Sequence, residues 1–277
     1  MSLRSSHGPA NHQTPRSVRR TWRAEGICIG IVDYAPNRIM PAHAHDTLGI
    51  SVVLRGAVEE TSGRSTEHAG VASAVIKPPG TVHANRFGPD GARLLAVELS
   101  AERAVGLLDH QGCLDRWRWV RLLRALGVAG RGLLELSRAQ QASDEALENV
   151  AIDLVAALDD DVRVWSAAIA PAWLARVRER LEDDYGRPCR VRELALEAGV
   201  HPVYLARRFR RQFGASVVGY LRAVRVRAAV RELAEADRSL ADVAYHTGFA
   251  DQSHLTRTLR AMTGLTPLDY RLMSRSS

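Results

Sequence analysis

"LADVAYHTGFADQSHLTRTLRAMTG" (240–264) repeats, with one extra residue, an earlier stretch of the same chain, "VRELALEAGVHPVYLARRFRRQFG" (191–214). Each stretch carries an alanine and a glycine four residues apart: Ala195 and Gly199 in the first, Ala244 and Gly248 in the second. A small residue lets a second helix cross closely, and glycine readily adopts the positive φ with which a chain leaves a helix. Each copy is therefore predicted to form a helix, a short turn and a second helix.

The second helices of both copies are predicted to have an apolar inner stripe and a polar outer stripe. The outer stripes hold Val203, Ala206, Arg207 and Arg210 in the first copy, and Gln252, Ser253, Thr256, Arg257 and Arg260 in the second. Arginine can pair with guanine and glutamine with adenine in the major groove of DNA. A helical hairpin with a merely solvated outer face is the alternative, but two copies in register favour DNA binding.

The charge of the chain is concentrated in the same region. Residues 171–277 contain 19 arginines, no lysine and 12 acidic residues, which accounts for the whole net charge of +7. A basic segment beside a neutral one indicates a polyanionic partner. The connector, residues 217–237, lacks proline, and about 19 helical residues would span roughly 28 Å. This length approaches the ~34 Å repeat of B-DNA, so both second helices could lie on one side of a duplex.

Residues from about 171 to 273 resemble the paired helix-turn-helix domain of the AraC/XylS family of bacterial transcription regulators. The resemblance depends on these motif residues: Ala195, Gly199, Leu205, Arg207, Phe209, Gly214, Ala244, Gly248, Phe249, Leu255, Arg257, Gly264, Pro267 and Tyr270. It implies that bases are read by Val203, Ala206 and Arg207 in one copy and by Gln252, Ser253, Thr256 and Arg257 in the other. Two features depart from the family pattern. Val203 and Ala206 are short and apolar, and Arg208 occupies a position that is usually apolar.

The N-terminal region, residues 21–100, has the character of a β-structure. Short runs rich in Val, Ile and Leu, such as "GICIGIVDY" and "LGISVVLRG", alternate with Gly, Pro or Asn, which indicates a small barrel or sandwich. The family resemblance implies a cupin-like, effector-binding barrel here. The predicted fold class is thus multidomain: an N-terminal cupin-like β-barrel with helices, followed by a C-terminal all-α double helix-turn-helix domain.

Two histidines stand two residues apart in "PAHAHDTLGI" (41–50), a predicted strand. Alternate residues of a strand point to the same face, so His43 and His45 could share a metal ion. The resemblance to metal-binding cupins, however, implies a glutamate four or five residues further on, and Gly49 or Ile50 stands there. A second cupin pattern fits at Pro78, Gly80 and His83, but its closing asparagine position holds Phe87.

Two interpretations of His43, His45 and His83 follow. They could bind a divalent ion such as zinc, with water as a fourth ligand, or they could form hydrogen bonds with an organic effector inside the barrel. The missing glutamate favours the organic effector, so no metal or other cofactor is predicted. Trp22 and Arg23 are expected to close over this pocket.

The remaining segments are predicted from their composition and periodicity. Residues 1–20 are polar and are expected to form a disordered arm. Residues 101–165 have a helical pattern, and the helix over 143–159 is expected to help form a homodimer. Residues 159–171 are predicted to be the linker, with Pro171 opening the next helix.

Composition argues against several other classes of protein. There is no run of about 18 apolar residues and no apolar signal-peptide core, so no membrane association is expected. The three cysteines are far apart and form no disulfide framework, which favours a cytoplasmic protein. The fingerprints of nucleophile elbows, P-loops and dinucleotide sites are missing from the sequence, which argues against an enzyme.

The predicted function is therefore a sequence-specific DNA-binding transcription regulator that responds to a small-molecule effector. Its expected partners are double-stranded promoter DNA, the effector and a second copy of the chain, with RNA polymerase as a further candidate. One alternative is a metal-sensing regulator that uses His43, His45 and His83. The other is a metal-dependent cupin enzyme with a DNA-binding appendage, against which the missing glutamate argues.

Overall fold

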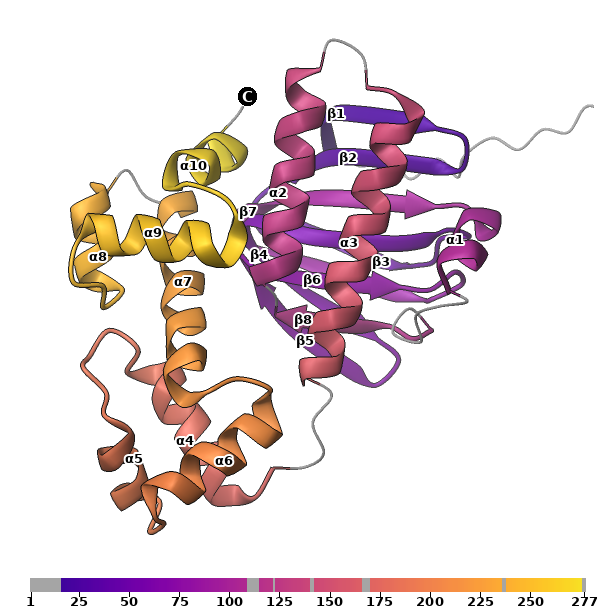
Figure 1. Cartoon of the computed structure of the whole chain (residues 1–277). Helices are drawn as coiled ribbons and strands as arrows, with labels where there is room; N and C mark the ends of the chain where they lie inside the picture. Colours follow the sequence, from indigo (N-terminus) through magenta and orange to yellow (C-terminus); the bar gives the residue numbers. More distant parts are fainter. Residues whose placement is uncertain are drawn as a thin grey trace, which may run out of the picture.

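A computed structural model describes residues 16–108, 115–121, 123–139, 142–165, 170–235 and 238–275. An N-terminal antiparallel sheet packs against two long helices, and a helical domain with two helix-turn-helix motifs follows (Figure 1). The predicted fold class is thereby confirmed. No helix in these ranges combines the length and the apolar character that a membrane span requires.

The sheet has eight strands in the order β1-β2-β7-β4-β6-β8, with β3 beside β7 and β5 beside β4. The strands are β1 (Arg16–Ala24), β2 (Ile27–Tyr34), β3 (Ile39–His43), β4 (Leu48–Ser62), β5 (Ser65–Gly70), β6 (Ser73–Lys77), β7 (His83–Leu99) and β8 (Arg118–Arg121).

The two longest strands, β4 and β7, bend where they pass each other. Gly56 of β4 has φ +75°, and a Cβ atom there would lie 2.0 Å from the carbonyl oxygen of Gly91 in β7. The pairing register also shifts between Gly56 and Val58, which is a sign of a β-bulge. The bend allows one face of the sheet to enclose a small cavity, while the other face packs against helices.

The helices are α1 (Ala101–Leu108), α2 (Leu123–Arg138), α3 (Asp144–Trp165), α4 (Ala172–Asp183), α5 (Val191–Glu197), α6 (Pro202–Phe213), α7 (Val217–Glu235), α8 (Leu240–His246), α9 (Gln252–Thr263) and α10 (Pro267–Arg275). Helices α2 and α3 cover one face of the sheet (Figure 1). Their residues Leu126 and Leu154 are buried with Ile50 and Val97 of the strands. The apolar stripe of α3 is therefore part of the core.

The two helix-turn-helix motifs belong to different hydrophobic cores. The first motif has its own core, in which Leu205 and Phe209 of α6 pack with Leu174 of α4 and Tyr220 of α7. The second motif shares one continuous core with the sheet, α2 and α3. Helix α7 contributes its first half to one core and its second half to the other.

The structure corrects the predicted boundaries at three places. Residues 16–20 belong to β1 and not to a disordered arm, because their backbone pairs with β2; residues 1–15 lie outside the described ranges. Residues 118–121, predicted as helix, form β8 beside β6. Residues 159–165 continue α3 and are not part of the linker, of which 166–169 are not described.

The error at β8 has a physical cause. The apolar spacing around Val120 fits a helix, but two tryptophans two residues apart also fit a strand, in which they share a face. Trp119 lies opposite Val75 of β6 and lines the cavity, while Val120 is buried on the other face. Residues 118–121 form a strand and not a helix because they pair with β6, which is distant in sequence.

Candidate nucleic-acid interface and effector pocket

Caps at both ends place the second helix of each helix-turn-helix motif. In the first motif, the imidazole of His201 accepts a hydrogen bond from the backbone N–H of Val203, and α6 ends at Gly214 with φ 69°. In the second motif, Asp251 caps α9 by accepting from the N–H of His254 at 2.6 Å, and α9 ends at Gly264 with φ 75°. Both helices thus begin and end at equivalent points.

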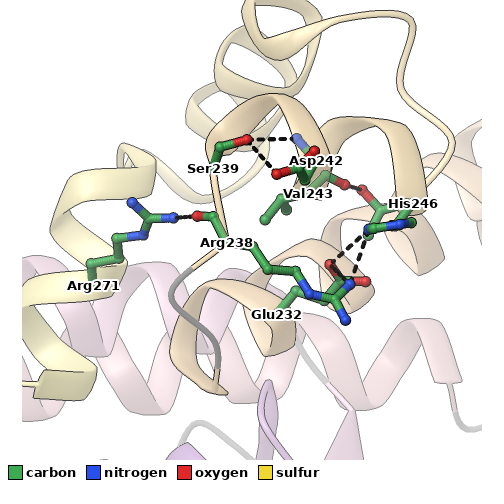
Figure 2. Close-up of polar contacts among 8 residues, drawn as sticks. Glu232, Arg238, Ser239, Asp242, Val243, His246 and Arg271 are labelled. Atoms are coloured by element: carbon green, nitrogen blue, oxygen red, sulfur yellow. Dashed lines mark hydrogen bonds and ion pairs between the residues drawn. The ribbon is translucent and has the colours of Figure 1, made fainter.

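The turn that leads into α8 is held by residues from three helices (Figure 2). Ser239 caps α8, since its hydroxyl accepts from the N–H of Asp242 at 3.1 Å and donates to the Asp242 carboxylate at 2.7 Å. Arg238 donates to Glu232 of α7 at 3.3 Å, and its own carbonyl accepts from Arg271 of α10. These contacts fix the second motif to the end of α7.

The predicted DNA-reading residues lie together on the outer faces of α6 and α9. In α6, Leu205 and Phe209 are fully buried, and in α9 the same is true of Leu255 and Leu259. The outer residues Val203, Ala206, Arg207, Arg210, Gln252, Ser253, Arg257 and Arg260 are exposed, and Thr256 is half-buried.

Four of these outer residues are arginines: Arg207, Arg210, Arg257 and Arg260. Within the described ranges, no hydrogen bond or ion pair engages the guanidinium group of any of them. Arg208 instead is half-buried, with a buried Nε that has no hydrogen-bond partner among the described residues. Its aliphatic stem therefore fills the position that is usually apolar.

The inner face of the sheet encloses a cavity of about 70 Å³. Its apolar wall includes Tyr34 and Phe87, whose rings stack with centroids 4.0 Å apart. Polar side chains also line the cavity: His43, His45, Thr47, Ser51, Glu60, Lys77, His83, Asn85 and Glu98. The three predicted histidines are thus brought together, and six polar neighbours join them that sequence analysis did not identify.

The histidine cluster has a defined arrangement of ring nitrogens. His43 and His83 are paired on neighbouring strands, and the potential ligand atoms of His43, His45 and His83 all lie within 4.8 Å of one another. Nδ1 of His43 lies 2.8 Å from the carbonyl oxygen of Pro41, and Nδ1 of His83 lies 3.0 Å from that of Thr81. Because a carbonyl only accepts, both Nδ1 atoms carry hydrogen, and a neutral ring then keeps its lone pair on Nε2.

Ionisation in the cavity is set by burial and by one lysine. Burial lowers the pKa of His83 to about 4, and the charge of Lys77 adds to this effect, so the ring is neutral near pH 7. Burial alone would raise the pKa of Glu60. Lys77 and hydrogen bonds from Trp117 and Asn85 outweigh burial and hold the pKa of Glu60 below its usual value.

Glu60, like Glu98, is a carboxylate at the cavity that sequence analysis missed. It is 1% exposed, and it accepts 2.6 Å hydrogen bonds from Asn85 Nδ2 and Trp117 Nε1. Two other carboxylates close in sequence to the histidines or to Glu60 do not line the cavity: Asp46 is exposed, and Glu59 pairs with His68. The register shift of β4 between Val53 and Arg55 changes which of its residues point inward, from Ser51 and Val53 before it to Val58 and Glu60 after it, so only knowledge of that shift could have identified Glu60.

The structure does not bring Trp22 and Arg23 to the cavity, which corrects their predicted place. Trp22 lies opposite Ile29 in the β1–β2 pair, and both side chains are buried on the face that packs against helices. Arg23 is exposed on β1. Cross-strand partners share a face, so pairing with β2 directs Trp22 away from the cavity.

Two family models match the chain. The AraC-like ligand binding domain matches residues 26–174, and the helix-turn-helix domain matches residues 194–273. The regulator GlxA of Rhizobium meliloti is 35% identical over 106 residues, which are 38% of this chain and 32% of GlxA. The Bacillus subtilis transcriptional activator and DNA repair enzyme AdaA is 26% identical over 103 residues, 37% of this chain and 49% of AdaA.

These matches span only about a third to a half of the length of the curated relatives. Among solved structures, ToxT from Vibrio cholerae O395 aligns with 92% of this chain and 100% of its own, at 10% identity and a TM-score of 0.39. Because the ligand-binding model alone spans more than half of the chain, and the helix-turn-helix model follows it, this chain belongs to the AraC family of transcription regulators.

Proposed function

We propose that this protein is a sequence-specific DNA-binding regulator whose N-terminal domain responds to a small-molecule effector, and that it is not an enzyme. One observation carries the DNA-binding part. Arg207 and Arg257 occupy equivalent positions on α6 and α9, and both are exposed, with guanidinium groups that have no hydrogen-bond or ion-pair partner within the described ranges. Two such surfaces fit two neighbouring stretches of major groove.

The connector supports the same proposal. Helix α7 has 19 residues, which corresponds to roughly 28 Å of helix, close to one turn of B-DNA. Arginine contacts with phosphates would supply most of the affinity, and contacts with base edges would determine the sequence specificity. Since Val203 and Ala206 are short, we expect the first motif to discriminate less between bases than the second.

The test is a selection of bound oligonucleotides from a random pool with the full-length protein. The proposal expects enrichment of one sequence with two half-sites about one helical turn apart. Binding of the selected duplex should weaken steeply as salt increases, and a scrambled duplex should bind less tightly at moderate salt. A pool that remains random after selection would reject the proposal.

The size of the cavity limits the effector. At about 70 Å³, the cavity is smaller than the ~300–1,000 Å³ that is typical of organic-ligand sites. An organic effector must therefore be very small, or the strands around His43 and Trp119 must separate to admit it. The lining would offer such a ligand stacked aromatic rings, imidazoles and the Lys77–Glu60 pair.

A metal-sensing regulator is a second candidate, and the geometry of the three imidazoles favours it. His43, His45 and His83 would hold the ion, with Nδ1–H of two rings anchored on backbone carbonyls as is common for metal-binding histidines. Three imidazoles with one open position suit zinc, which would supply a Lewis acid there. Both oxygens of Glu60 already accept hydrogen bonds, from Asn85 and Trp117. Glu60 would therefore position these two side chains and would not be a ligand of the ion.

The two candidates differ in the metal content of the protein. Full-length protein, purified without an affinity tag and equilibrated with zinc, should retain one equivalent if the metal candidate is correct. His83→Ala should lose that zinc, and His68→Ala, at an exposed histidine of β5, should keep it. Unaltered protein without bound zinc would reject the metal candidate and leave the organic effector.

The further partners are part of the same proposal. We expect a homodimer through the outer surface of α2 and α3, action in the cytoplasm, and contact with RNA polymerase at the promoter. The stripe Leu147, Val150, Leu154 and Leu158 is buried against the sheet. A dimer would instead use the exposed residues of α3, among which Ile152 is 42% exposed.

A further inference from the structure

The regulatory domain is the N-terminal sheet together with α2 and α3. The second helix-turn-helix motif shares a core with this domain, whereas the first motif has a core of its own. Leu259 of α9 and Met273 of α10 belong to the same core as Leu126 and Leu133 of α2. In Figure 1, α9 and α10 lie beside α2 and the β4–β7 region, whereas α5 and α6 lie at the far end of α7. A change in the regulatory domain can therefore reach the second motif directly.

Two arginines of the regulatory domain bind backbone carbonyls of this motif. Arg93 of β7, whose side chain is 3% exposed, donates from Nη1 to the carbonyl of Met273 in α10 at 3.1 Å. Arg131 of α2 donates from Nη1 to the carbonyl of Thr263, the last residue of α9, at 2.6 Å. The last carbonyls of a helix lack partners within the helix, and a cation there also suits the helix dipole.

The backbones of α2 and α9 also meet with no space between them. A Cβ atom on Gly127 would lie 2.2 Å from the carbonyl oxygen of Thr263, and one on Gly130 would lie 2.5 Å from Leu265. Neither glycine has a positive φ, so glycine is not required by the conformation of α2. What these positions require is the absence of a side chain where the second motif docks.

Arg93, which binds the Met273 carbonyl of α10, also binds a residue of β2, a strand that lines the cavity. The guanidinium of Arg93 forms a fork with the carboxylate of Asp33 on β2, at 2.8 and 3.0 Å. Asp33 lies between Val32 and Tyr34, and Arg93 precedes Leu94; these three neighbours line the cavity. A shift of β2 against β7 on binding would therefore move the group that holds α10.

We infer that Arg93, Gly127 and Arg131 form a docking surface for the C-terminal ends of α9 and α10, through which occupancy of the cavity changes the placement of the second motif. This inference rests on the proposed function. The outer stripe of α9 remains exposed in the docked state, so docking orients the second motif and does not cover its DNA-reading face. The first motif, whose core includes the first half of α7 and not the sheet, responds through α7.

The test compares Gly127→Ala and Arg131→Met with Arg138→Met, an exposed arginine in the last turn of the same helix. Alanine is favoured over glycine within a helix, so loss of protection after Gly127→Ala cannot come from weakening α2 itself. Hydrogen exchange of the full-length protein without DNA should accelerate about tenfold over residues 260–273 in both docking variants. Exchange over residues 191–213 should stay unchanged, and Arg138→Met should match the unaltered protein.

A second measurement uses the duplex selected by the unaltered protein. Binding this duplex should alter exchange in β2 and β7 in the unaltered protein, because coupling between two sites is reciprocal, and Gly127→Ala should abolish that response. Failure to select any duplex would reject the proposed function, while the exchange measurement without DNA would still test the docking surface. Unchanged exchange over residues 260–273 in both variants would overturn the inference, as would equal acceleration throughout the chain.

Discussion

Asn85 and Glu60 lie opposite each other on β7 and β4, and the Asn85 amide donates a 2.6 Å hydrogen bond to the buried Glu60 carboxylate. Asn85→Ala would leave this charged group short of one partner at a position that is 1% exposed. We expect the free energy of unfolding to fall by about 1–3 kcal/mol, as is typical when a buried polar group loses its partner. Chemical denaturation of the metal-free protein measures this change.

The matched control is Asn149→Ala, at an exposed position of α3. It should leave the midpoint and slope of denaturation unchanged. Equal stability of Asn85→Ala and the control would show that Trp117 and Lys77 suffice to hold Glu60.

The lowered pKa of His83 predicts that the protein loses stability in mild acid. The unfolded chain binds a proton at pKa 6.5 and the folded chain only at about 4, so the stabilisation is complete above pH 6.5 and is lost as the pH falls towards 4. The difference corresponds to roughly 3 kcal/mol. Glu60, whose pKa is also lowered, adds a loss below pH 4.5.

Denaturation at a series of pH values, in the presence of a chelator, tests this prediction. His83→Gln should flatten the dependence between pH 6.5 and 4, and His68→Gln, at an exposed position, should retain it. A His83→Gln protein with the original pH dependence would assign the acid sensitivity to other groups.

The helix-turn-helix motifs could be predicted from the sequence because their signals are local. The glycines at 199 and 248, the cap at Ser239 and the apolar spacing of Leu255 and Leu259 all act within one or two turns of helix. These signals predicted both the motifs and the side of each helix that is exposed.

The cavity could be predicted only in part because its residues depend on strand register. The predicted strand over 41–50 is wrong, because His43 ends β3 and His45 lies between β3 and β4, but their closeness in sequence still placed both rings at one location. Glu60 points inward because the register of β4 shifts between Val53 and Arg55, and Trp22 points away because of its pairing with β2. Both depend on hydrogen bonds between strands distant in sequence, which no local pattern contains.

The proposed dimer predicts a role for the exposed side of α3. Ile152→Asp would place a charge on this surface without affecting the buried stripe of the same helix. We expect the unaltered protein to sediment as a dimer at micromolar concentration and the Ile152→Asp protein to dissociate more readily. A monomer in the unaltered protein would reject the proposed dimer.

The separate cores predict that the two helix-turn-helix motifs lose stability separately. Phe209→Ala and Leu259→Ala each remove a fully buried side chain, at a cost of about 3–5 and 2–5 kcal/mol respectively. Phe209→Ala should destabilise the first motif alone, while Leu259→Ala should destabilise the core that includes the sheet.

Hydrogen exchange of the full-length variants separates these outcomes. Phe209→Ala should accelerate exchange in α4 to α6 and leave β4 and β7 protected, and Leu259→Ala should accelerate exchange in α8 to α10 together with α2. If either substitution affected all regions equally, the two cores would form one cooperative unit.

Because Arg207 and Arg257 occupy equivalent positions, replacing either one should cost a comparable amount of binding free energy, each at its own half-site of a selected duplex. Arg257→Ala should weaken binding by about 1–3 kcal/mol and relax the base preference at its contact, because the guanidinium would no longer pair with a base edge. Arg207→Ala should act in the same way at the other half-site. Fluorescence anisotropy with duplexes altered in one half-site at a time measures both the affinity and the preference.

Arg138→Ala, in the last turn of α2, removes the same charge outside the DNA-binding domain and controls for net charge. It should leave the base preference unchanged. Arg257→Ala could instead weaken binding of all duplexes equally and lower the number of counterions released on binding, read from the salt dependence, by about one. Arg257 would then contact phosphate and not a base. An unchanged binding curve would remove Arg257 from the interface, and the DNA-reading face of α9 would then have to be sought among Gln252, Ser253 and Thr256.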